Sequence, residues 1–68
     1  MNAELKNILL EKRWEEGHEC YYKDIDNTRY YYDVYAKTFS FEENNCGIIE
    51  FLGVATLETL EKIENNEF

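Results

Sequence analysis

The chain contains no proline, three glycines, two cysteines and no long run of apolar residues. A membrane-spanning helix needs about 18 consecutive apolar residues, so none is expected here. Three separated glycines cannot form a glycine-rich phosphate loop. Because no proline forces a break in a helix or strand, glycines and Asn/Asp clusters must mark the turns. Such clusters lie at residues 26–28 and 44–47.

Basic residues are also scarce. Seven Lys and Arg stand against fifteen Asp and Glu, which gives a net charge of −8 at pH 7. Most of the excess lies in residues 38–68, where Lys62 is the single base among seven acids. Nucleic acids and anionic membranes are bound through clustered Lys and Arg, so the sequence argues against both as direct partners. Complementary charge favours a basic partner protein, and the alternative is that the acidity serves only solubility.

The two cysteines, Cys20 and Cys46, allow at most one internal disulfide. The first residues form an amphipathic stretch with acids, unlike a secretory signal peptide, so we expect a cytoplasmic protein with both thiols reduced. A chain of 68 residues predicts one acidic domain, residues 1–68. A typical ligand pocket occupies about 300–1,000 Å³, which a domain of this size can hardly enclose. The size therefore favours a binding module over an enzyme.

The N-terminal half predicts a helix followed by a β-hairpin. Apolar residues in 3–16 have the spacing of one helix face, and Gly17 is a suitable stop. Residues 18–25 and 29–37 are rich in tyrosine and β-branched residues, which predicts two strands. Asp26, Asn27 and Thr28 between them have the composition of a tight turn.

The C-terminal half predicts one or two further strands and a second helix. Phe39 and Phe41 alternate, which indicates either a bulged continuation of the second strand or a third strand. Residues 48–52 form a short apolar strand, and residues 54–64 repeat apolar side chains at helical spacing. Thr56 would cap this helix if its first turn is irregular, and Asn65 and Asn66 are its expected end.

The order α-β-β-β-α predicts a small two-layer α+β sandwich, in which N- and C-terminal helices flank an antiparallel sheet of three to four strands. The apolar faces of these elements predict a core. The expected core residues are Leu5, Ile8, Leu9, Trp14, Ile25, Tyr30, Tyr32, Val34, Ile49, Phe51, Leu57 and Leu60.

No motif supplies a complete metal or catalytic site. A calcium loop starting at Asp24 would need Gly where Arg29 stands and Glu where Tyr35 stands. His18 with two separated cysteines falls short of the four ligands of a structural zinc site. We therefore expect no metal, no cofactor and no enzymatic activity.

Two groups of residues are candidates for partner binding. The first is a row of carboxylates at every third position of the second helix, Glu58, Glu61, Glu64 and Glu67, which Glu42, Glu43 and Glu50 would extend. Their neighbours lie roughly 5–6 Å apart on a helix, close to the spacing of successive phosphates on DNA. An ordinary solvated helix face is the alternative. Replacing Glu58, Glu61 and Glu64 by Gln should leave the fold intact, because Gln has nearly the same helix propensity as Glu.

The second group lies in the tyrosine-rich hairpin, which holds all six tyrosines of the chain. Alternation places Tyr30 and Tyr32 against the core, and it leaves Tyr31, Asp33 and Tyr35 facing outward. Exposed tyrosines are enriched in protein interfaces, so these residues are the second candidate surface.

In composition and size the chain resembles the small acidic inhibitors that phages and mobile elements encode, some of which mimic DNA. The resemblance implies an inhibitor that occupies the basic groove of a nucleic-acid-binding host or defence protein. The alternative function is a structural or assembly module, or a small homodimeric subunit, whose acidity serves only solubility.

Overall fold

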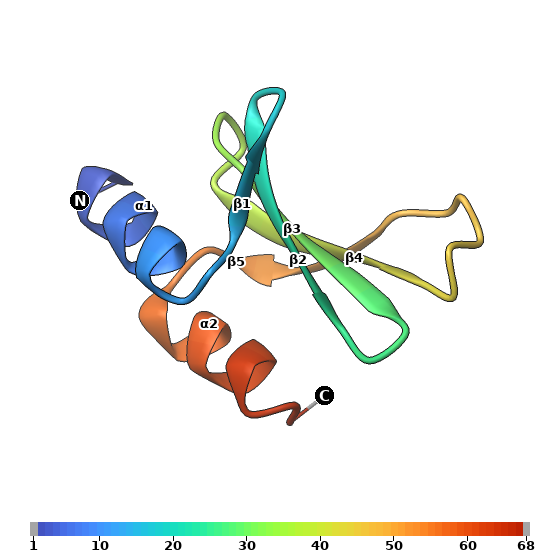
Figure 1. The fold of residues 1–68 in the computed structure, drawn as a ribbon. Coiled ribbons are helices and arrows are strands. Elements are labelled where there is room, and N and C mark those ends of the chain that lie inside the picture. The colour runs from blue at the N-terminus through green and yellow to red at the C-terminus, as the bar shows by residue number, and fades with distance from the viewer. Residues whose placement is uncertain (1, 68) are drawn as a thin grey trace.

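The computed structural model describes residues 2–67, with side chains from Leu5 onward. It contains two helices and one five-stranded antiparallel sheet (Figure 1). The elements are α1 (Asn2–Glu11), β1 (Glu15–Gly17), β2 (Cys20–Ile25), β3 (Thr28–Asp33), β4 (Thr38–Glu43), β5 (Glu50–Val54) and α2 (Leu57–Glu64). The strands pair in chain order, as expected of a meander. The predicted α+β fold with a helix near each end is confirmed, whereas the sheet has five strands instead of three or four.

The additional strand arises because α1 ends earlier than predicted. Arg13 has a φ of 72°, a left-handed conformation that closes a helix. The Trp14 amide then donates to the Leu9 carbonyl at 3.0 Å, and the Trp14 side chain is buried. Residues 15–17 continue as β1 along β2. The predicted helix over residues 3–16 with Gly17 as its stop is therefore wrong at its C-terminal end.

The hairpin forms where it was predicted. Ile25 pairs with Thr28, so the loop between β2 and β3 is Asp26 and Asn27, and Asp26 adopts a φ of 56°. The second strand of the hairpin ends at Asp33, four residues earlier than expected. The Asp33 carboxylate accepts the amides of Tyr35 and Ala36, both at 2.9 Å, and so forms a turn. Phe39 and Phe41 therefore belong to a separate strand, β4.

The predicted end of the second helix at Asn65 is confirmed, whereas its predicted start at Val54 is wrong. The Thr56 hydroxyl caps α2 by accepting the amide of Thr59 at 3.1 Å, and Asn65 is the C-cap residue. The helix begins only at Leu57, so Val54, which was assigned to its apolar face, belongs to β5 instead.

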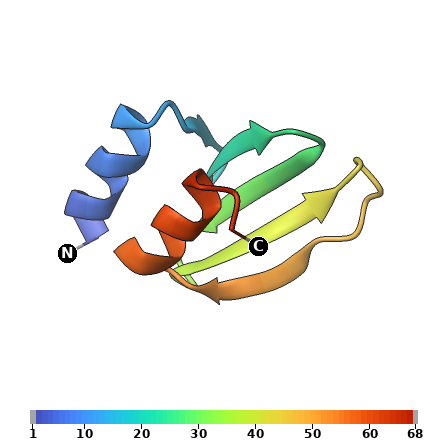
Figure 2. The same ribbon diagram turned by 90° about the horizontal axis from the view of Figure 1, so that it is seen from below.

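Both helices lie on the same side of the sheet (Figure 2). They bury Leu5, Leu9, Leu60 and Ile63 against the side chains of the sheet. Tyr32 lies at the centre, with ring centroids 5.6 Å from Phe39 and 6.2 Å from Tyr21. Trp14 extends this cluster at 5.7 Å from Phe39. Aromatic pairs of this kind contribute about 0.5–1.5 kcal/mol beyond the area that they bury.

Most of the predicted core is confirmed. The buried members are Leu5, Leu9, Trp14, Tyr30, Tyr32 and Leu60, and Ile8 and Ile25 are partly buried against them. The prediction is wrong for Val34, Ile49, Phe51 and Leu57, which are exposed. The buried residues that it missed are Tyr21, Phe39, Ala55 and Ile63.

Each error has a local cause. Val34 follows the end of β3 and Ile49 precedes β5, so neither lies in the sheet. Leu57 is the first residue of α2 and does not lie on its buried face. A bulge between β4 and β5 changes the alternation of β5, and Phe51 pairs with Ser40 on the side away from the helices.

Candidate functional site

The face of the sheet opposite the helices is the main candidate site. Side chains alternate along a strand, so the sequence neighbours of the buried Tyr21, Tyr30, Tyr32 and Phe39 point to the other side. Neither helix covers that side (Figure 2). We call it the open face. In the strand registers it carries Glu15, Cys20, Tyr22, Asp24, Arg29, Tyr31, Asp33, Thr38, Ser40, Glu42, Phe51 and Val54.

An aromatic row crosses the open face. Successive strand pairs place five residues side by side, in the order Glu15, Tyr22, Tyr31, Ser40 and Phe51. The Phe51 side chain is 67% exposed, whereas Tyr22 and Tyr31 are half-buried. Three rings thus form part of one surface that spans all five strands.

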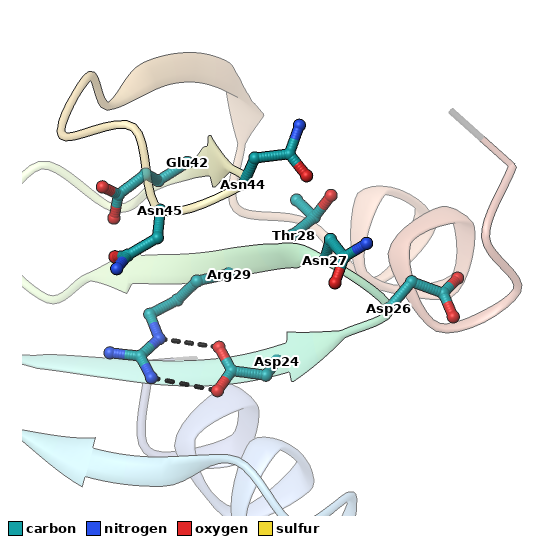
Figure 3. Close-up of a pocket in the computed structure, with 8 residues that line it drawn as sticks. All are labelled: Asp24, Asp26, Asn27, Thr28, Arg29, Glu42, Asn44 and Asn45. Carbon is teal, nitrogen blue, oxygen red and sulfur yellow. Dashed lines mark hydrogen bonds and ion pairs between the residues drawn. The ribbon is translucent and has the colours of Figure 1, made fainter.

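A second row of side chains, next to the aromatic row on the open face, is charged. Arg29 on β3 forms a bidentate pair with Asp24 on β2, from Nε to Oδ1 at 2.6 Å and from Nη2 to Oδ2 at 2.9 Å (Figure 3). The hydrogen bond from Arg29 lowers the pKa of the Asp24 carboxyl. The guanidinium carbon lies 4.9 Å from the centroid of the Tyr22 ring, within cation–π distance. Arg29 in the charged row therefore helps to fix the position of the Tyr22 ring in the aromatic row.

Glu42 connects the open face to the loop between β4 and β5. Its Oε1 accepts the Tyr31 hydroxyl at 3.1 Å, and its Oε2 accepts the Gly47 amide at 2.6 Å. Burial and the hydrogen bond to Glu42 raise the pKa of Tyr31, so this phenol stays protonated as a donor. The Tyr31 ring and the Glu42 carboxylate are thus ordered before any partner arrives.

An open hollow of about 530 Å³ lies at the hairpin end of this face. It is lined by Asp24, Asp26, Asn27, Thr28, Arg29, Glu42, Asn44 and Asn45 (Figure 3). Among residues 2–67, no group of three or more His, Cys, Asp or Glu side chains is arranged to hold a metal ion. The hollow forms part of the polar border of the open face.

The structure separates the predicted hairpin residues. Tyr31 and Asp33 both lie on the open face, and the Asp33 carboxylate also accepts backbone amides of the turn after β3. Tyr35 lies in that turn and is 74% exposed. Glu43 ends β4 in register with Thr28 and is exposed. Together with burial, Glu43 and Asp26 raise the pKa of Tyr30.

The carboxylates of α2 do not form one uniform row. Glu58 and Glu61 are exposed, but Glu64 is half-buried and accepts the Trp14 indole N–H at 2.6 Å and the Lys23 ammonium at 2.8 Å. Glu67 follows the end of the helix. Because α2 lies on the opposite side of the sheet, its carboxylates and Tyr31 belong to two separate surfaces (Figure 2).

Tyr22, Arg29 and Phe51 are among the residues of the open face that the sequence-based reasoning missed as candidates. The alternation of β2 shows that Tyr22 faces away from Tyr21, but only the strand register places it beside Tyr31. Phe51 was assigned to the core because the bulge that turns it outward has no clear sequence signal.

Comparison with protein-family models, curated proteins and solved structures finds no match to this chain. Among the described residues, no helix is long and apolar enough to cross a membrane. A function for this chain must therefore be argued from its own surfaces.

Proposed function

We propose that this chain is a non-enzymatic acidic binding protein that takes a basic protein onto its open face. The observation that carries the proposal is the aromatic row of Tyr22, Tyr31 and Phe51 bordered by carboxylates. Aromatic residues are enriched in protein interfaces, and tyrosine is common among the few residues that supply most of the binding energy. Four acids, Glu15, Asp24, Asp33 and Glu42, share this face with one base, Arg29.

The contact between Arg29 and Tyr22 is an internal example of how such a face binds a cation. A guanidinium lies over the Tyr22 ring and pairs with the adjacent Asp24 carboxylate. Arginine from a partner would meet the same combination at Tyr31, whose ring lies beside the Glu42 carboxylate. Cation–π contacts contribute about 0.5–1 kcal/mol at exposed sites and more where water is excluded.

The net charge of −8 indicates which class of basic protein the partner belongs to. Proteins that handle nucleic acids carry clustered Lys and Arg for phosphate contacts, which makes them the natural complement of this chain. We propose that the chain sequesters such a host or defence protein by imitating the charge of DNA, as its resemblance to phage and mobile-element inhibitors implies. The exposed Glu58 and Glu61 on α2 would add to the negative field and accelerate encounter.

Affinity purification from a bacterial lysate at about 50 mM and about 500 mM salt tests this proposal. We expect a basic nucleic-acid-binding protein at low salt and its loss at high salt. The purified partner should bind DNA on its own, and the chain should compete with that DNA. Retention of only neutral or acidic proteins, or a partner that binds DNA and the chain at the same time, would refute charge mimicry.

A further inference from the structure

The edge strand β5 is the least protected part of the sheet. The sheet ends at β1 on one side and at β5 on the other, so each has unpaired backbone N–H and C=O groups along one edge. β1 is short and carries two exposed glutamates, features that discourage pairing with another chain. β5 has five residues, and Glu50 is its single charged one.

Exposed apolar side chains concentrate around this edge. Eight large apolar residues are exposed in the described part of the chain, and five of them lie in residues 48–57. They are Ile48, Ile49, Phe51, Val54 and Leu57, with exposed fractions between 53% and 67%. A free strand edge with such a sequence is a template for adding another strand.

We propose that a second copy of this chain pairs antiparallel with β5 to form a homodimer with one continuous ten-stranded sheet. Residues 48–57 contain no base and one acid, so apart from the Phe51 ring this edge offers little to the basic partner expected on the open face. A second copy brings the same apolar side chains, as a two-fold symmetric interface requires. The proposal does not depend on the function proposed above.

The position of the single charged residue of β5, Glu50, favours antiparallel pairing of the two copies. In such a pair the start of one β5 lies against the end of its copy, so Phe51 can lie opposite Val54 of the copy, which shares its open face. The two Glu50 carboxylates then stay at opposite ends of the interface. A parallel arrangement would place them side by side, where like charges destabilise a strand pair.

Salt should distinguish this contact from the binding of a basic partner. Each copy carries a net charge of −8, so the two copies repel each other at long range. Salt screens that repulsion, and the Debye length shortens from about 14 Å at 50 mM to about 4 Å at 500 mM. The dimer should therefore tighten as salt rises, whereas a complex with a basic protein should weaken.

Sedimentation of the full chain across a concentration series, at about 50 mM and about 500 mM salt, tests the dimer. We compare Val54→Glu with Val54→Ile at this 62% exposed position. Glutamate would set a carboxylate against Phe51 of the copy and should weaken the dimer about tenfold, whereas isoleucine keeps an apolar side chain there and should preserve it. Leu10→Glu, an exposed apolar residue of α1 at 44%, adds the same charge away from β5 and should leave the dimer near wild-type strength.

Circular dichroism of each variant verifies that its fold is unchanged. A wild-type chain that stays monomeric at both salt concentrations overturns the proposal. It is also overturned if Val54→Glu dimerises as tightly as Leu10→Glu, or if Val54→Ile loses the dimer as fully as Val54→Glu. A dimer that weakens as salt rises would place the contact on a charged surface instead of β5.

Discussion

The indole N–H of Trp14 donates to the Glu64 carboxylate at 2.6 Å, across a separation of 50 residues in the chain. The contact joins the segment after α1 to the last turn of α2. Lys23 on β2 donates to the other oxygen of the same carboxylate at 2.8 Å. One half-buried glutamate thus holds both ends of the chain and the sheet together.

Replacing Glu64 by Gln should therefore destabilise the fold. The amide keeps the shape but loses the charge that pairs with Lys23, and hydrogen bonds to charged groups contribute about 1.5–3 kcal/mol. Because Glu64 and Lys23 are still partly exposed, we expect a loss of about 1–2 kcal/mol in urea unfolding. Glu61→Gln, an exposed residue of the same helix, is the matched control and should change little. Equal stability of the two variants would contradict a structural role for Glu64.

This role alters an expectation from the sequence. Triple replacement of Glu58, Glu61 and Glu64 by Gln was expected to leave the fold intact. Because Glu64 accepts hydrogen bonds from Trp14 and Lys23, its replacement should instead destabilise the fold. A test of charge mimicry should change Glu58 and Glu61 only.

Leu9 is fully buried between the helices and the sheet, so its truncation should be costly. Leu9→Ala should lower the free energy of unfolding by about 2–5 kcal/mol, the usual range for a large-to-small core change. Leu10→Ala, at a position that is 44% exposed, provides the comparison on the same turn of α1. If the two alanine variants unfold at the same urea concentration, the face of α1 that meets the core is misassigned.

Local chemistry explains which parts of the fold were predictable. The turn at Asp26 and Asn27, the cap at Thr56 and the alternation in β3 depend on residues close in sequence, and all three were predicted. The end of α1 depends on Trp14 entering the core beside Phe39, a residue far along the chain. Such tertiary contacts override local helix propensity.

The candidate site was harder to predict for the same reason. Tyr31 was identified from alternation within its own strand, but its row partners Tyr22 and Phe51 follow from the pairing of all five strands. The role of Glu64 depends on Trp14 and Lys23, which lie 50 and 41 residues away in the chain. No spacing rule along a single helix reveals such contacts.

Alkaline pH should destabilise the fold through its tyrosines. Burial raises the pKa of Tyr30, Tyr31 and Tyr32, with nearby carboxylates as further causes. The unfolded chain then releases these protons first, near the ordinary pKa of about 10. The stabilisation is fully present below that pH and is lost as the pH rises through the folded-state values.

Ultraviolet absorbance of tyrosinate checks this prediction. Part of the tyrosine signal should titrate later in the folded protein than in about 6 M guanidinium. Tyr30→Phe should remove one late-titrating group. This variant should therefore lose less free energy of unfolding than the wild type above about pH 10. Identical titration curves in the folded and denatured protein would refute the prediction.

The two thiols should differ in reactivity. Both are free, Cys46 being exposed and Cys20 half-buried on β2. Burial, followed by the nearby Asp33 carboxylate, raises the pKa of Cys20, and the thiolate is the reactive form. Iodoacetamide should therefore modify Cys46 before Cys20, as peptide mass mapping over time can measure. Cys46→Ser should retain only the slow phase, and a fast phase in that variant would contradict the assignment.

Partner binding should depend on the two candidate surfaces in different ways. Tyr31→Ala with Phe51→Ala removes two rings from the open face and should mainly accelerate dissociation, since buried aromatic contacts determine how long a complex lasts. Glu58→Gln with Glu61→Gln removes two exposed charges from α2 and should mainly slow association at low salt. Glu11→Gln with Glu16→Gln, also exposed, is the control for net charge alone.

Surface plasmon resonance with the purified basic partner separates these effects. If the α2 variant associates no more slowly than the Glu11 and Glu16 control, α2 makes no specific contribution, and the field of the whole chain steers encounter. If the aromatic variant dissociates at the wild-type rate, the open face is not the contact surface. A dimer through β5 could mask the loss of Phe51, so Tyr31→Ala alone is measured beside the double variant, and its faster dissociation would still assign the contact to the open face.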